Sequence, residues 1–192
     1  MNNFSPVFEH LHNLVTTNKL PSAVFGVADK NGVLALDGFG SQADDLYLLW
    51  SVTKPVVGLA FMQLVERGLI NLQHEVKQYL PWFGANRTDK VQLWHLLTHT
   101  SGISENSLSP SEDKRTNLQG ASVNFHAGTH KQYSNQAFVA QEEILKAVTG
   151  LTLEAYAQQN LFQPLNMAHT SFDTHELNPE GYQPCTGWTK CL

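Results

Sequence analysis

A serine and a lysine, Ser51 and Lys54, lie three residues apart at the start of an apolar segment. On a helix, this spacing places both side chains on one face. The first turn of a helix offers positive potential and free backbone amides, and a neutral lysine amine can accept the proton of a serine hydroxyl. The pair is therefore a candidate for a nucleophile, Ser51, and the base that activates it, Lys54.

The Ser-x-x-Lys pattern is weak by itself, because about one match is expected by chance in a chain of this length. A second match, from Ser111 to Lys114, lies in a polar stretch and has no apolar helix behind it to hold the two side chains. Of the two matches, Ser51 and Lys54 are therefore the stronger candidates, and the pattern alone assigns neither pair a function.

A tyrosine and an asparagine, Tyr133 and Asn135, lie just before a predicted helix. A phenol close to Lys54 can relay a proton or act as a second base, because the ammonium charge favours the phenolate. Asn135 can hold Lys54 or a substrate amide. The alternative is an ordinary turn tyrosine beside a helix cap. Without further context, the residue types favour that alternative.

Nine histidines raise the question of a metal site, and His95 and His99 are spaced to share a helical face. A helical zinc-protease motif carries a glutamate next to its first histidine, whereas Leu96 follows His95 here. We therefore expect structural imidazoles. No metal or organic cofactor is expected, because a serine and a lysine suffice for acyl transfer.

The spacing of apolar residues predicts the elements that position these side chains. A helix is expected over 4–18, and an Asn-Gly step between two apolar runs indicates a β-hairpin. A dense apolar run that ends at Gly68 predicts a mostly buried helix behind Ser51. The remaining expectations are strands over 23–28 and 33–39, the buried helix over 52–68, helices over 91–98, 135–149 and 153–161, and an exposed loop over 104–124.

The composition is that of a globular protein of 192 residues with a net charge of −5. No basic patch for nucleic acid is present, and the longest apolar stretch, 56–65, is too short to span a membrane. The first residues do not resemble an export signal, so we expect a cytoplasmic protein. The two cysteines, Cys185 and Cys191, are too near the end of the chain to link a core.

Three segments in order, 50–54, 95–103 and 133–135, resemble the serine β-lactamase-related family of class C β-lactamases, class VIII esterases and D-alanyl peptidases. The match runs from about residue 4 to residue 175. The resemblance implies that Ser51 is acylated, that Lys54 is the general base and that Tyr133 handles the leaving-group proton. It also implies that Asn135 contacts Lys54 or the substrate amide, and that the Ser51 backbone amide is one oxyanion donor.

The implied fold is α+β and β-lactamase/transpeptidase-like, helix-rich with an N-terminal β-hairpin. Family members continue into further strands, one of which bears a Lys-Thr-Gly or His-x-Gly motif, and we expect this chain to lack them. The segment 185–187 has no lysine, and 126–129 precedes Tyr133 and is typical of a turn. We therefore predict one incomplete domain over 1–192, divided into 1–50, a helical part over 51–175 and an irregular tail over 176–192. Unpaired sheet edges would favour self-association.

These observations predict a serine hydrolase that forms an acyl-enzyme on Ser51 and has esterase-like or β-lactamase-related activity. Its partner would be a small ester, amide or β-lactam substrate, with no nucleic acid and no membrane involved. The alternative is an inactive truncated homologue that acts as a binding protein or is a mere fragment.

Overall fold

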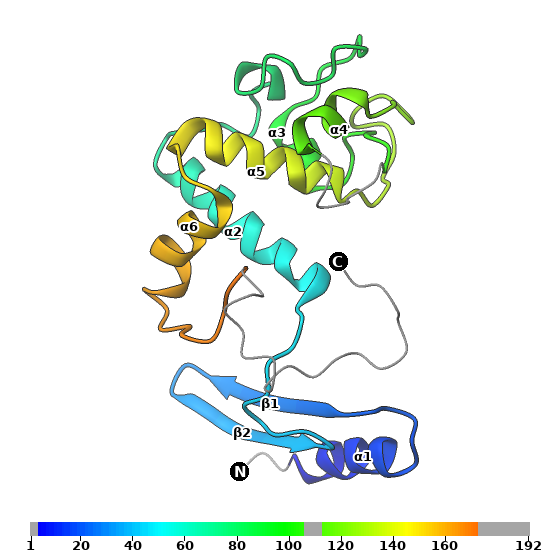
Figure 1. The fold of residues 1–192 in the computed structure, drawn as a ribbon, viewed down its shortest axis with the longest axis vertical. Helices are drawn as coiled ribbons and strands as arrows, with labels where there is room; N and C mark the ends of the chain where they lie inside the picture. The colour runs from blue at the N-terminus through cyan, green and yellow to red at the C-terminus, as the bar shows by residue number, and fades with distance from the viewer. Residues whose placement is uncertain (1–3, 106–112, 173–192) are drawn as a thin grey trace. The chain divides into compact units, whose positions relative to one another are not determined.

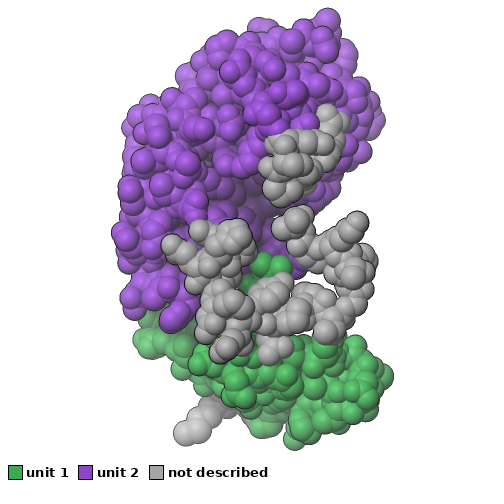
Figure 2. Space-filling view, in the orientation of Figure 1, with its two compact units in different colours: residues 1–48, 173–191 green, residues 49–172, 192 purple. Residues whose placement is uncertain are grey.

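The computed structural model describes residues 4–105 and 113–172, drawn in colour in Figure 1. These residues divide into two compact units, 4–48 and 49–172, which Figure 2 distinguishes by colour. The boundary lies close to the division at residue 50 that the sequence predicts. Two parts of the sequence analysis lie outside the described residues: Ser111, and the predicted tail over 176–192 with its two cysteines. The interpretation of the chain as one incomplete domain stays a prediction.

The first unit is a helix packed on a β-hairpin (Figure 1). Helix α1 (Ser5–Thr16) carries Phe8, whose ring lies 5.5 Å from that of Phe25 and 5.9 Å from that of Phe39. Strands β1 (Ala23–Asp29) and β2 (Gly32–Phe39) pair antiparallel. The helix and hairpin predicted from the spacing of apolar residues are therefore confirmed.

The hairpin turn differs from the prediction by one residue. Asp29 pairs with Gly32, so the two-residue loop is Lys30–Asn31 and the Asn-Gly step is not at its centre. The Asp29 carboxylate accepts the Asn31 backbone N–H at 2.7 Å, and this local hydrogen bond selects the turn. The sheet has two strands in the described residues, and Val33 and Leu36 of β2 are exposed. Self-association through the sheet edges stays a prediction.

The second unit is helical, and its core gathers around helix α5 (Gln136–Thr149). Helix α5 contacts α2, α3, α4 and α6, and its Ile144 and Leu145 are fully buried. Gly150, with φ 73°, ends α5 in the left-handed conformation where the sequence predicts a stop. The other elements are η1 (Trp50–Val52), α2 (Thr53–Glu66), η2 (Val76–Gln78), α3 (Leu93–Leu97), α4 (Lys114–Gly120), α6 (Leu153–Ala157) and a π-helical turn, η3 (Gln158–Phe162).

Helix α2 is buried on one face only, which corrects the expectation of a mostly buried helix. Its buried residues are Val57, Ala60, Phe61 and Leu64. On the other side, Leu59 is 49% exposed and Met62 is 44% exposed. Helices α5 and α6 both contact α2. Apolar composition alone could not tell which face has a partner.

The stretch 104–124, expected as an exposed loop, contains helix α4 with its buried Leu118. Asp113 caps this helix by accepting the Thr116 backbone N–H at 2.9 Å. An isolated β-bridge also joins Ile103 to Val123. The polar composition of this stretch did not predict these elements, because α4 buries a single apolar side chain and so leaves no periodic apolar pattern in the sequence.

Two other helices are shorter than the sequence predicts. Helix α3 begins at Leu93 because Gln92 is extended and forms a bridge with Glu75. Helix α6 ends at Ala157 and continues as the π-helical turn η3, whereas one helix was expected over 153–161. These boundaries depend on backbone contacts, which the apolar pattern does not record.

A buried ion pair holds the loop that leads to Tyr133. Asp89 pairs with Arg87 at 2.7 Å, and its carboxylate also accepts the Ala127 backbone N–H at 2.6 Å. Ala127 lies in a turn in which the Thr129 backbone N–H donates to the His126 carbonyl, which confirms the turn predicted over 126–129. The hydrogen bond from Arg87 is the main cause that lowers the pKa of Asp89 from 3.8 to about 2.

We expect Asp89→Asn to lower the free energy of unfolding by at least about 2 kcal/mol at pH 7, because the Arg87 charge would stay buried without its partner. The ionised Asp89 stabilises the fold above pH 3.8, and this contribution is lost as the pH falls toward about 2. Urea unfolding followed by tryptophan fluorescence at pH 7 and pH 3 measures the difference. An equal gap between variant and wild type at both pH values would contradict the assignment.

Candidate active site

Four of the residues singled out in the sequence meet in the second unit. A hydrogen bond of 2.5 Å joins Ser51 Oγ to Tyr133 Oη. Lys54 Nζ donates to Ser51 Oγ at 3.3 Å and to Asn135 Oδ1 at 2.7 Å. The structure therefore brings together two segments about 80 residues apart in the chain.

The local fold explains how Ser51 and Lys54 come to face each other. Ser51 lies in η1, which runs directly into α2, and Lys54 lies in the first turn of α2. Trp50, immediately before the serine, has a φ of 49°, a left-handed conformation that is unfavourable for a bulky residue. Backbone strain of this kind is typical of functional sites, where the surrounding structure has to maintain it.

Tyr133 is held by His99, which the sequence places in the family-like segment 95–103. The two rings stack with their centroids 4.6 Å apart. His99 Nδ1 accepts the Ser134 backbone N–H at 3.1 Å, and the His99 carbonyl accepts the Gln132 backbone N–H at 2.9 Å. His99 thus fixes the backbone on both sides of Tyr133, a role that its spacing from His95 did not reveal.

The charge of Lys54 shapes the electrostatics of the site. Its ammonium nitrogen lies 4.6 Å from the centre of the Tyr133 ring. Burial raises the pKa of the Tyr133 phenol, but interactions with Lys54 and Ser51 outweigh it, so the pKa falls below its ordinary value of 10. Burial, followed by the charges of Lys54 and Lys131, lowers the pKa of His99. The site therefore favours a neutral imidazole and eases deprotonation of the phenol.

Glu105 is a member of the site that sequence reasoning did not find. Its carboxylate accepts the backbone N–H of Asn135 at 2.5 Å and the Asn135 side-chain Nδ2 at 3.1 Å. The sequence places Glu105 in the stretch expected as an exposed loop, 104–124. No local signal identified Glu105, because its partners lie 30 residues further along the chain.

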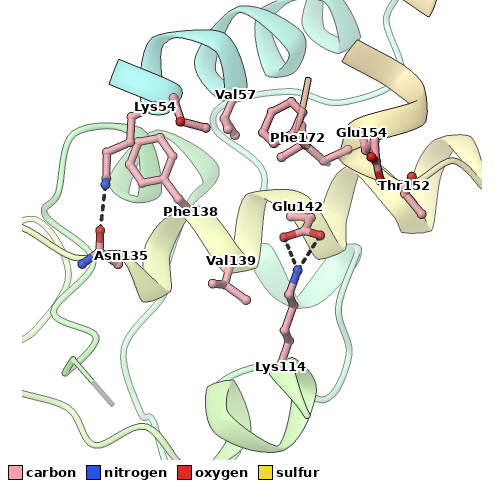
Figure 3. Close-up of a pocket in the computed structure, with 12 residues that line it drawn as sticks. Lys54, Val57, Lys114, Asn135, Phe138, Val139, Glu142, Thr152, Glu154 and Phe172 are labelled. Atoms are coloured by element: carbon pink, nitrogen blue, oxygen red, sulfur yellow. Dashed lines mark hydrogen bonds and ion pairs between the residues drawn. The ribbon is translucent and has the colours of Figure 1, made fainter. Parts of the chain in front are cut away.

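A partly open pocket of about 480 Å³ begins at Lys54 and Asn135 (Figure 3). Phe138 and Val139 of α5 form part of its wall, and an ion pair between Lys114 and Glu142 lies along another part. Apolar wall and charged groups together suit the side chain of a small substrate. Its remaining lining residues are Thr53, Val57, Thr152, Leu153, Glu154 and Phe172.

The histidine pair is engaged in backbone hydrogen bonds. His95 Nδ1 accepts the Gln92 backbone N–H at 2.9 Å, and His99 Nδ1 accepts from Ser134. Over 4–105 and 113–172, no group of three or more His, Cys, Asp or Glu side chains is arranged to hold a metal ion. In the same part of the chain, no helix is both long and apolar enough to cross a membrane.

The family model described as Beta-lactamase matches residues 7–190. The chain belongs to the beta-lactamase family. Among curated relatives, it is 30% identical over 167 residues to Protein flp of Staphylococcus aureus, a match that covers 74% of this chain and 33% of that protein. It is 31% identical over 175 residues to Esterase EstB of Burkholderia gladioli, covering 79% of this chain and 43% of that protein.

Solved structures show the same fold. An octameric penicillin-binding protein homologue from Pyrococcus abyssi superposes with a TM-score of 0.80 at 23% identity, over 94% of this chain and 49% of that one. The β-lactamase/transpeptidase-like fold, helix-rich with a β-hairpin, is therefore confirmed. The chain spans less than half the length of these two curated relatives, Protein flp and Esterase EstB.

Proposed function

We propose that this chain is a serine hydrolase that forms an acyl-enzyme on Ser51. The observation that carries the proposal is the contact of one serine oxygen with Tyr133 Oη and Lys54 Nζ, two groups that can take its proton in their deprotonated forms. An activated nucleophile is recognised by such a hydrogen bond to a base, which is in turn oriented by a third group. Asn135 takes that third position by accepting from Lys54.

The proposed reaction has two steps. Ser51 Oγ attacks the carbonyl carbon of the substrate and gives its proton to the Tyr133–Lys54 pair, and the Ser51 backbone amide stabilises the oxyanion. The leaving group departs with a proton that Tyr133 returns, which leaves an ester on Ser51. Water then attacks this ester, the carboxylic acid is released and Ser51 regains its proton. No cofactor is required for this chemistry.

The geometry refines the assignment of the base. Tyr133 Oη lies 2.5 Å from Ser51 Oγ, whereas Lys54 Nζ lies 3.3 Å away. We therefore infer that the phenolate takes the serine proton directly and that Lys54 stabilises that phenolate. The competing hypothesis is that Lys54 is the direct base, as the family resemblance implies.

Small esters are the substrates that we propose first. One curated relative is named as an esterase, and the pocket beside Lys54 has an apolar wall that suits a short acyl chain. Amides follow the same chemistry with an amine as the leaving group, whereas in a β-lactam the ring C–N bond breaks and the protonated nitrogen stays attached to the acyl group.

A non-catalytic binding protein is the second candidate. Tyr133 is 49% exposed and Trp50 is 51% exposed, whereas acyl-transfer sites gain from excluding water. A site this open can hold a ligand without turning it over. Covalent labelling separates the two candidates.

The test is intact-mass spectrometry of the chain after incubation with p-nitrophenyl butyrate and, separately, with penicillin G. We expect one acyl adduct per chain, and peptide mapping should place it on the peptide that contains Ser51. A cooperatively folded sample that binds either compound but neither carries an adduct nor hydrolyses the compound would reject the hydrolase and favour the binding protein. The identity of the adduct distinguishes an esterase from a β-lactamase.

The pH dependence of acylation tests the role of Tyr133. If the phenolate takes the serine proton, acylation rises with pH and is half-maximal at the folded-state pKa of Tyr133, which lies below 10. We expect Tyr133→Phe to lose this rise and to slow acylation by about 100-fold or more. Single-turnover p-nitrophenol release between pH 6 and about 10 measures both. A Tyr133→Phe variant with the wild-type profile would assign the titration to another group.

A further inference from the structure

Glu105 joins the start of helix α5 to the proposed reaction centre. Its carboxylate accepts three hydrogen bonds: from the Asn135 backbone N–H at 2.5 Å, from Asn135 Nδ2 at 3.1 Å and from the Gln136 backbone N–H at 3.4 Å. Asn135 Oδ1 at the same time accepts from Lys54 Nζ at 2.7 Å. The Asn135 amide therefore lies between a carboxylate and an ammonium group.

The orientation of that amide follows from the chemistry of its two neighbours. A carboxylate only accepts hydrogen bonds and an ammonium group only donates them. With the amide as it stands, Nδ2 faces Glu105 and Oδ1 faces Lys54, so both contacts are satisfied. A reversed amide would place oxygen against oxygen and one N–H donor against another, and both contacts would be lost.

A purely structural role explains only part of this geometry. The two backbone contacts cap the N-terminus of α5, where negative charge is favourable. A cap needs no contact with the Asn135 side chain, yet the second carboxylate oxygen makes one. Asn135 Oδ1 accepts from Lys54 Nζ. The contact of Asn135 Nδ2 with Glu105 therefore determines that the oxygen of the amide, and not its nitrogen, faces the lysine.

We propose that Glu105 is a positioning residue for acyl transfer and acts through Asn135, whose oxygen it holds toward Lys54. The proposal rests on the hydrolase function proposed above. Without the carboxylate, the Asn135 amide is free to reverse, and Lys54 loses the acceptor that keeps it beside Ser51 and Tyr133.

The first variant is Glu105→Gln. Its amide oxygen can still accept from the two backbone N–H groups, so we expect little change in thermal stability. Its NH2 group would face Asn135 Nδ2, donor against donor, and the Asn135 amide should reverse. We expect kcat for acylation to fall by about 10- to 100-fold with little change in KM, because misplacement of a catalytic group slows chemistry at this scale. Glu143→Gln, which removes one charge from α5, is the matched control and should behave as wild type.

The second variant makes the test specific. Asn135→Asp places a carboxylate against Glu105 and should also slow acylation. In the double variant Glu105→Gln, Asn135→Asp, the new carboxylate can accept from both the new amide and Lys54. We expect the double variant to acylate faster than either single variant. Additive losses in the double variant would overturn the positioning role, because damage to a simple cap cannot be reversed by a change in the Asn135 side chain.

An NMR measurement tests the proposal even if the wild-type chain forms no acyl-enzyme, an outcome that would reject the hydrolase function alone. In wild type, one Asn135 side-chain N–H donates to a carboxylate and its proton should be shifted downfield. Glu105→Gln should remove that shift, and Glu143→Gln should not. An Asn135 side-chain resonance that is the same in wild type and Glu105→Gln would overturn the proposal.

Discussion

Acylation is expected to disappear in Ser51→Ala. The serine oxygen is the atom that forms the ester, and its removal leaves the Tyr133–Lys54 pair with no hydroxyl group to activate. We expect the acyl adduct to vanish and p-nitrophenol release to fall by at least about 1,000-fold. Both are measured on the same samples, by intact mass and by absorbance.

The matched control for this variant is Ser111→Ala, which removes the serine of the other Ser-x-x-Lys match. It should keep the wild-type adduct and rate. Ser51 is exposed, so the alanine variant should unfold within about 0.5 kcal/mol of wild type, and lost activity would then reflect chemistry. An adduct that persists in Ser51→Ala would place the acylated residue elsewhere and reject Ser51 as the nucleophile.

The sequence predicted those parts of the site that depend on local spacing. Ser51 and Lys54 share a face because of the geometry of one helical turn, and Gly150 ends α5 because a left-handed residue is needed there. Tyr133 and Asn135 required the resemblance, because no spacing rule connects positions about 80 residues apart. Their residue types alone favoured an ordinary turn and a cap.

The features that the sequence missed depend on partners from elsewhere in the chain. Glu105 looked like part of a polar loop, and only the fold shows that it caps α5 and holds Asn135. The burial of α2 was overestimated because an apolar helix does not reveal which of its faces another element covers. Helix α4 escaped notice because one buried leucine, Leu118, is a weak pattern.

Lys54 is expected to be nearly as important as Ser51, and two substitutions separate its charge from its ability to accept a proton. Lys54→Met removes both, and we expect acylation to fall by about 1,000-fold or more. It should also raise the pKa of Tyr133, because interactions with the lysine are among the causes that lower it. Ultraviolet titration of the tyrosines against Tyr133→Phe should show this rise, and residual activity should shift to higher pH. Lys146→Met, at the far end of α5, is the control and should leave rate and titration unchanged.

Lys54→Arg decides which group takes the serine proton. Arginine keeps the positive charge but does not lose its proton in proteins, so it can stabilise a Tyr133 phenolate and cannot act as a base. If Tyr133 is the base, we expect Lys54→Arg to acylate at least about tenfold faster than Lys54→Met and to keep the pH dependence that Tyr133→Phe abolishes. An arginine variant as slow as Lys54→Met, in a sample with the wild-type unfolding curve, would instead make the lysine amine the base. The 2.5 Å contact between Ser51 and Tyr133 would then serve to return the proton to the leaving group.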